Sequence, residues 1–142
     1  MTIRTLLDAG ADNAVALTAP DRPAMTYAAL RRHVDSVGRQ LAGNGLGPSD
    51  RVAIVLPNGP EMASAFMAVA AYMSAAPLNP AYKESEYAFY LEDLAPKLII
   101  VEAGSENPIR AAASALSIPV VEAVVGDIDP AGAFTLFETE SD

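Results

Sequence analysis

The sequence predicts an α/β fold of three layers, in which a mostly parallel sheet carries helices on both faces. Two apolar runs, Val52–Leu56 and Leu98–Val101, are continuous rather than alternating, which is typical of strands that are covered on both sides. Helical patterns lie between the apolar runs, and strands that alternate with helices form parallel sheets through crossover connections. With 142 residues, 51% of them hydrophobic, the chain suits one domain that buries about 68–70% of its unfolded surface.

The first fifty residues predict a short helix, two extended segments and a long amphipathic helix. The short helix is expected over Thr2–Ala9, and the extended segments over Val15–Leu17 and Ala24–Tyr27. Thr26 is a suitable N-cap for the long helix. The apolar face of that helix recurs at helical spacing in Leu30, Val34, Val37 and Leu41. The polar face contains Arg31, Arg32, Asp35 and Arg39, and the helix is expected to end at Gly43 and Gly45.

A strand, a helix and a second strand are predicted over residues 51–78. After the first apolar strand, Asn58 and Gly59 form a turn, and Pro60 stands in the first turn of the helix, where proline is favoured. The segment Met62–Met73 is apolar on nearly all sides, so we expect this helix to be buried. Ala75–Leu78 then returns as a short strand.

The remaining chain repeats this alternation before an acidic tail. A helix with an inner face of Tyr87, Tyr90, Leu91 and Leu94 precedes the strand Leu98–Val101. Asn107 caps and Pro108 opens the next helix, and Val120–Val125 is the last predicted strand. We therefore expect an α/β subdomain over residues 1–125. Residues 126–142 are expected to be a loosely ordered acidic tail that leads to a missing remainder, since only Phe134, Leu136 and Phe137 are expected to be buried.

Composition excludes several classes of function. A net charge of −9 disfavours nucleic-acid binding, which requires Lys and Arg to replace the counterions of phosphates. The absence of cysteine excludes disulfides, thiol nucleophiles and cysteine-ligated zinc. No signal peptide is evident, and the apolar segment Met62–Met73 is too short for a membrane span of about 20 residues. We expect a cytoplasmic or organelle-matrix location.

Most polar candidates have a structural interpretation that outweighs a catalytic one. Gly43–Gly47 resembles a phosphate loop, but a helix precedes it and a strand follows, so it is interpreted as a helix stop. His33 is the only histidine and has no cysteine to share a zinc ion with. The carboxylates on the fourth predicted helix are interpreted as its solvated face rather than an acid–base pair; they are Glu84, Glu86, Glu92 and Asp93.

Aromatic residues, serines and two asparagines complete the candidates. Tyr82, Tyr87 and Tyr90 could form a binding shelf, although core packing is favoured. No nucleophile elbow surrounds any of Ser64, Ser74, Ser85 and Ser114. Ligands collect beyond the carboxyl ends of parallel strands, so Asn58 and Asn79 could contact a ligand or another domain, with turn formation as the simpler role. We expect no catalytic, cofactor-binding or metal-binding residue within this chain.

Several short blocks, in order and at characteristic spacing, resemble the start of an adenylate-forming acyl-CoA synthetase. The resemblance covers residues 3–125, and its blocks are Met25–Leu30, Gly45–Ala53, Leu56–Glu61, Ala76–Tyr82, Tyr90–Asp93 and Pro96–Ile100. Within that superfamily, Ala76–Tyr82, Phe89–Leu91 and Ala111–Pro119 most resemble oxalate–CoA ligases.

The resemblance implies an AMP-forming ligase that activates a carboxylate with ATP and magnesium as an acyl-adenylate and then transfers it to CoA. It also implies the N-terminal subdomain of the synthetase fold, with the phosphate loop, the acyl and adenine pockets and the catalytic lysine further along. The chain alone is therefore expected to be inactive, with the remainder of the same enzyme as its partner. Apolar surface left bare predicts a homo-oligomer. Two alternatives remain, an adenylation domain of a peptide synthetase and a free-standing non-catalytic α/β module, and the sequence does not identify the acid.

Overall fold

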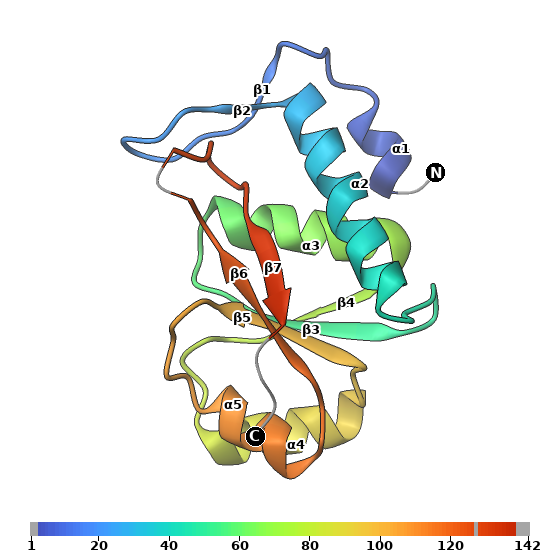
Figure 1. Ribbon diagram of the computed structural model, residues 1–142, viewed down its shortest axis with the longest axis vertical. Coiled ribbons are helices and arrows are strands. Elements are labelled where there is room, and N and C mark those ends of the chain that lie inside the picture. The colour runs from blue at the N-terminus through green and yellow to red at the C-terminus, as the bar shows by residue number, and fades with distance from the viewer. Residues whose placement is uncertain (1–2, 127, 139–142) are drawn as a thin grey trace.

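The computed structural model describes residues 3–126 and 128–138. Along the chain its elements are α1 (Ile3–Leu7), β1 (Val15–Leu17), β2 (Met25–Thr26), α2 (Tyr27–Gly43), β3 (Arg51–Val55), α3 (Pro60–Tyr72), β4 (Ser74–Pro77), α4 (Glu84–Leu94), β5 (Leu98–Glu102), α5 (Ile109–Ala115), β6 (Val120–Val124) and β7 (Thr135–Glu138). Five strands form one sheet in the order β4-β3-β5-β6-β7, while β1 and β2 form a separate antiparallel ribbon (Figure 1). The pairs β4–β3, β3–β5 and β5–β6 are parallel and only β6–β7 is antiparallel, which confirms the predicted sheet.

The centre of the sheet explains the continuous apolar runs. Strands β3 and β5 pair in register, with Val52 opposite Leu98 and Val55 opposite Val101. Successive side chains of a strand point to opposite faces. Val52 and Ile54 therefore pack with α2 and α3, whereas Ala53 and Val55 pack with α4 and α5. Figure 1 shows these two pairs of helices on opposite sides of the sheet, as the predicted three layers require.

Helix α2 begins and ends where the sequence predicts. The Thr26 hydroxyl accepts a hydrogen bond from the Ala29 N–H at 3.2 Å, which is the expected N-cap. All four predicted apolar positions of its inner face are buried. Gly45, with φ of +88°, turns the chain just after the helix, so Gly43–Gly47 is the predicted helix stop and not a phosphate loop.

Helix α3 differs from the prediction of a fully buried helix. Its inner side is buried against α2 and the sheet through Ser64, Ala65, Ala68 and Val69. Phe66, however, is 38% exposed, and so in part are Met62, Ala63, Met67 and Ala70. The sequence shows that α3 is apolar on nearly all sides, but it does not show which helices or strands pack against each side.

The prediction of a loosely ordered tail is wrong for the described residues 128–138. Their last part forms β7, which pairs along β6 from Val121–Glu138 to Val124–Thr135. Phe134 and Leu136 are buried because they alternate along an extended segment and so reach the same core, whereas Phe137 is exposed. Gln40 on α2 donates to the Leu136 carbonyl at 2.7 Å and holds the new strand in place. Residues 127 and 139–142 lie outside the described part of the chain.

Candidate functional site

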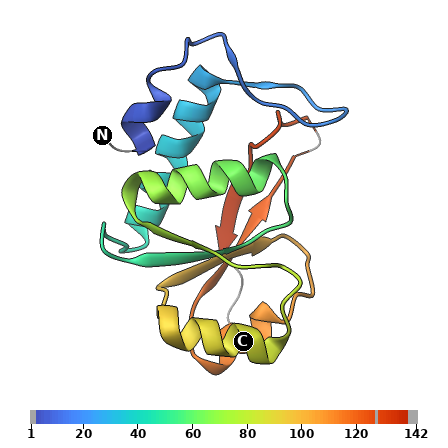
Figure 2. The same ribbon diagram turned by 180° about the vertical axis from the view of Figure 1, so that it is seen from behind.

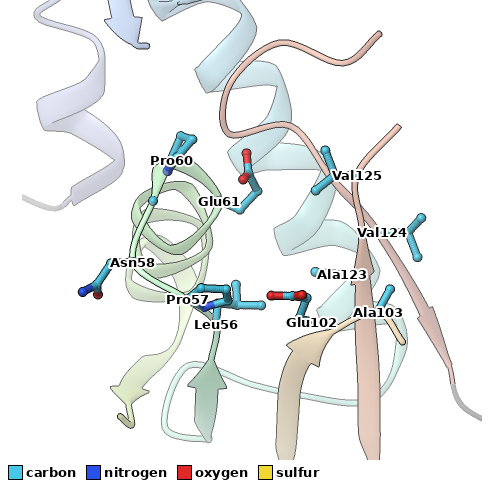
Figure 3. Close-up of a pocket in the computed structure, with 11 residues that line it drawn as sticks. Leu56, Pro57, Asn58, Pro60, Glu61, Glu102, Ala103, Ala123, Val124 and Val125 are labelled. Atoms are coloured by element: carbon cyan, nitrogen blue, oxygen red, sulfur yellow. The ribbon is translucent and has the colours of Figure 1, made fainter. Parts of the chain in front are cut away.

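A cleft lies beyond the carboxyl ends of β3, β5 and β6, on the side of the sheet where the sequence predicted that a ligand could bind. Its volume is about 380 Å³, and its walls come from residues 56–61, 102–103 and 123–125 (Figure 3). The chain passes from β3 to β4 on one side and then crosses to β5 on the other. The direction of winding thus reverses between β3 and β5, and such reversal points are where open α/β sheets place ligands.

Two carboxylates line this cleft, and one of them, Glu61, is paired with the Arg22 guanidinium at 2.7 Å. Figure 3 shows Glu61, from the first turn of α3, and Glu102, at the end of β5, on its walls. The residues of the walls include no lysine or arginine. Just outside the cleft, Arg110 donates to Glu122 at 2.5 Å and the Gly104 N–H donates to it at 3.1 Å. These bonds, first that from Arg110, lower the pKa of Glu122 below its ordinary value, so this carboxylate is ionised near neutral pH and is paired with Arg110.

Glu61 is the centre of a polar cluster that the sequence did not predict, here called the Glu61 clamp. Its carboxylate accepts hydrogen bonds from the Arg22 guanidinium and from the Gly132 N–H, each at 2.7 Å. Ser64 donates to the Gly132 carbonyl at 2.5 Å, and Arg22 also donates to the Pro130 carbonyl at 2.9 Å. The clamp, made of Arg22, Glu61, Ser64 and residues 130–132, fastens the segment before β7 to α3. Ser64 is therefore a buried structural donor and not a nucleophile.

The two candidate asparagines differ in their places. Leu78 N–H donates to the Ile54 carbonyl at 2.9 Å, so the ends of β3 and β4 do share one edge of the sheet. Asn79 accepts from the Ala81 N–H at 2.9 Å and is a turn former, as the simpler interpretation predicts. Asn58 lies at the cleft, but Figure 3 shows its amide pointing away from Glu61 and Glu102.

The remaining polar candidates do not assemble into a catalytic group. The four carboxylates of α4 are exposed, as a solvated face requires. Ser74, Ser85 and Ser114 are also exposed. Among the described residues no three His, Cys, Asp or Glu side chains are placed to hold a metal ion. No helix in the described part of the chain has the length and apolar character to cross a membrane.

The tyrosines divide between core and surface. Tyr87 is fully buried, as core packing predicts, and its hydroxyl donates to the Asn79 carbonyl at 2.7 Å. Tyr82 and Tyr90 are partly exposed and stack with ring centroids 5.2 Å apart. Phe89 meets Tyr90 edge-on and is 67% exposed. The aromatic row therefore has an inner member that packs the core and outer members that lie at the surface.

His33 is neither a metal ligand nor a base for any described serine. Its Nε2 atom is buried without a hydrogen-bond partner, and its ring meets Phe134 edge-on at 4.5 Å. Burial lowers the pKa of His33, against the opposing effect of the Asp129 and Glu61 carboxylates. The imidazole is therefore neutral near pH 7 and belongs to the packing between α2 and the segment before β7.

We expect the fold to lose stability as the pH falls below about 6.5, the ordinary pKa of histidine. Because the pKa of His33 is lowered in the folded state, the unfolded chain takes up the proton first, and the free energy of unfolding falls until the pH reaches the folded pKa. Urea denaturation at about pH 7.5 and about pH 5.5 measures this difference. His33→Phe keeps a ring against Phe134 and should reduce the difference in free energy of unfolding between the two pH values. If the wild-type protein and the variant showed the same pH dependence, His33 would not be its cause. Asp35 and Glu122, whose pKa values are lowered, titrate at more acidic pH.

Comparison with known proteins identifies the family. A sequence profile described as AMP-binding enzyme matches residues 8–141. The chain is 40% identical over 102 residues to a probable CoA ligase CCL9 of Humulus lupulus, a match that covers 71% of this chain and 19% of that protein. It is 37% identical over 123 residues to the oxalate–CoA ligase of Arabidopsis thaliana, covering 80% of this chain and 24% of that protein. Two nonribosomal peptide synthetases also match, one of Salinispora arenicola at 33% identity and one of Bacillus subtilis at 35% identity, each over 60% of this chain.

The fold agrees with this assignment. Apo MatB from Rhodopseudomonas palustris has a TM-score of 0.76 with this chain at 21% identity, covering 99% of this chain and 30% of MatB. The chain belongs to the AMP-binding enzyme family, as the resemblance predicted, since the profile extends over nearly all of it. It spans less than a quarter of the length of either CoA ligase.

Proposed function

We propose that this chain is the N-terminal part of an ATP-dependent acid–CoA ligase. Such an enzyme joins a carboxylate to the α-phosphate of ATP with loss of pyrophosphate, and the CoA thiol then displaces AMP from the acyl-adenylate. The mixed anhydride makes the carboxyl carbon electrophilic, which a carboxylate at neutral pH is not. The observation that carries the proposal is the similarity to two CoA ligases at 37–40% identity over most of the chain.

ATP, magnesium and CoA belong to the proposed complete enzyme rather than to residues described here. The cleft does not fit a triphosphate, because Glu61 and Glu102 line it without a basic side chain and the nearby Arg22 is already paired with Glu61. The described residues also offer no cluster of ligands for a divalent ion. We therefore assign the binding of these groups to the rest of the enzyme, which together with the carboxylic acid is the chain's proposed partner.

The 142-residue chain is expected to form no acyl-adenylate or thioester on its own. A chimera of the Arabidopsis oxalate–CoA ligase, in which this chain replaces the segment that it matches, is expected to form oxalyl-CoA. The subdomain would supply the scaffold and the remainder the reacting groups. Pyrophosphate release and thioester formation, each measured with ATP and with ATP omitted, test both proteins.

The controls separate misfolding from lack of function. Circular dichroism and a cooperative thermal transition show whether the chimera folds. A folded chimera that forms no thioester, or ATP-dependent thioester formation by the 142-residue chain alone, would contradict the proposal.

An adenylation domain of a peptide synthetase is the second candidate, because peptide synthetases are among the relatives. It would carry out the same first step and pass the acyl group to a carrier protein in place of CoA. A carrier domain encoded after residue 142 would favour it. A free-standing non-catalytic module is the third candidate and would gain support from a stop codon at that point.

The cellular setting is also a proposal. We place the complete enzyme in the cytosol or an organelle matrix. We further propose that the isolated 142-residue chain forms homo-oligomers, because it exposes large apolar side chains such as Phe66, Phe89 and Phe137.

A further inference from the structure

Helix α4 carries a phenylalanine in the middle of its outward side. Tyr87 and Leu91 are buried against the sheet, whereas Phe89, two residues from each, lies on the opposite side of the helix and is 67% exposed. Figure 1 places α4 on the side of the sheet opposite to α2 and α3. Figure 2 shows no described helix or strand over the side of α4 that faces away from the sheet. Outward positions of a surface helix are normally polar, so Phe89 departs from the usual pattern.

Phe89 belongs to a group of three aromatic side chains in contact with one another. Its ring meets that of Tyr90 edge-on, with centroids 5.5 Å apart. Tyr90 in turn stacks on Tyr82 at 5.2 Å, with 11° between the ring planes. Both tyrosines are partly exposed. Contiguous aromatic side chains at the surface mark an interaction site, whereas a single exposed one does not.

Three carboxylates surround Phe89 on the helix. Glu86 precedes it by three residues, and Glu92 and Asp93 follow it by three and four residues, spacings that make side chains neighbours on a helix. All three are exposed, and none forms an ion pair with a described residue. In the described chain the carboxylates that do form ion pairs each have an arginine partner; they are Asp8, Asp12, Asp35, Glu61 and Glu122. The three rings and these three carboxylates, here called the outer α4 face, therefore combine aromatic surface with negative charge that no described cation neutralises.

We propose that the outer α4 face binds an arginine-bearing segment of a partner protein. A guanidinium is planar, stacks on aromatic rings and donates to carboxylates, so it matches both features of this face at once. A second copy of the chain is a poorer occupant, because two chains of net charge −9 repel each other. This binding involves no group that reacts in a ligase, so the inference is separate from the proposed function.

Titration of the 142-residue chain with a defined peptide tests the proposal. The probe is a capped hexapeptide in which arginine and glycine alternate, and heteronuclear NMR spectra of the isotope-labelled chain follow its binding. We expect the amide signals of residues 82–93 to shift as the peptide is added. The same peptide with citrulline in place of arginine keeps the shape of the side chain but not its charge. It should bind at least about fivefold more weakly, because it loses the attraction to the rings and to the carboxylates.

Two variants separate the contribution of the rings from that of the charges. Phe89→Ala removes the central ring and should weaken binding about two- to fivefold, the usual range for an exposed cation–π contact. Phe137→Ala, which removes a 54% exposed ring from β7, is its matched control and should leave binding unchanged. Glu92→Gln should weaken binding about twofold or more. Its control is Asp21→Asn, which removes one charge from an exposed position between β1 and β2 and should have no comparable effect.

Several outcomes would overturn the inference. One is the absence of any shift over residues 82–93 at peptide concentrations up to about 10 mM, beyond the range of weak specific binding. Another is equal binding by Phe89→Ala, Glu92→Gln and their controls, since the attraction would then come from net charge alone. Light scattering detects a second copy as the occupant. If Phe89→Ala dissociates an oligomer of the 142-residue chain, the face belongs to a second copy.

The oxalate–CoA ligase chimera distinguishes a partner protein from the rest of the same enzyme. We expect the folded chimera to bind the arginine peptide with the same affinity as the 142-residue chain. If it does not bind the peptide, its own remainder covers the outer α4 face and the inference is overturned, even where the chimera forms thioester. Peptide binding by a folded chimera that forms no thioester would support the inference while contradicting the proposed function.

Discussion

Tyr87→Ala is expected to lower the free energy of unfolding by about 3–5 kcal/mol, the cost of deleting a large buried aromatic side chain. Tyr87 is fully buried beneath α4, where it packs with Ala53 and Val55 of β3 and with Leu78. Its removal leaves a cavity between α4 and the sheet, which the rigid strands cannot fill. Because a domain of this size has a stability of about 5–15 kcal/mol, the loss would be a large share of the total. Urea denaturation followed by circular dichroism measures it.

Two further variants serve as controls. One measures the contribution of the Tyr87 hydroxyl, and the other measures the effect of an alanine at an exposed position of the same helix. Tyr87→Phe loses only the hydrogen bond to the Asn79 carbonyl and should cost about 1 kcal/mol. Phe89→Ala, on the same helix but 67% exposed, should change stability by less than about 0.5 kcal/mol. If Tyr87→Ala were no more damaging than Phe89→Ala, the assignment of Tyr87 to the core would be wrong.

The parallel sheet could be predicted because its signals are local and mutually consistent. Val52–Leu56 and Leu98–Val101 have the composition of strands covered on both faces, and the structure pairs them side by side in parallel. Thr26 and the spacing from Leu30 to Leu41 likewise define α2 by properties of adjacent turns. Antiparallel pairing of these strands would have contradicted the predicted fold class.

The sequence-based predictions failed where the structure depends on contacts between residues far apart in the chain. The Glu61 clamp joins Glu61 to Gly132 and Ser64 to Gly132 across separations of 71 and 68 residues, and no periodic pattern reports such contacts. The same contacts hold the segment before β7, which was predicted to be loose because few apolar side chains were expected to bury there. For α3, the sequence correctly showed apolar residues on all sides of the helix. It could not show that no described element covers one of these sides. The position of the cleft could be predicted only because ligands bind beyond the carboxyl ends of parallel strands. That rule identified Asn58 but not Glu61 or Glu102.

Gly132→Ala is expected to lower the free energy of unfolding by about 2–3 kcal/mol, more than any ordinary loop substitution. Gly132 has a φ of +94°, where a Cβ atom is disfavoured. The added Cβ would also lie 2.6 Å from Leu17 Cδ1 and 3.3 Å from the Pro60 carbonyl oxygen. Leu17 can rotate away, but the Pro60 backbone at the start of α3 cannot move freely. The segment cannot relax either, because Glu61 and Ser64 hold the N–H and carbonyl of Gly132.

A matched substitution isolates the crowding from the backbone strain. Gly45 has a similar φ of +88°, but a Cβ placed there meets nothing within 4 Å. Gly45→Ala should therefore cost only about 1 kcal/mol, the strain of the left-handed conformation alone. The additional loss of unfolding free energy in Gly132→Ala, compared with Gly45→Ala, then measures how rigidly the Glu61 clamp holds the segment before β7 against α3. Equal losses for the two variants would show that this segment shifts freely, and the clamp would no longer explain why β7 is ordered.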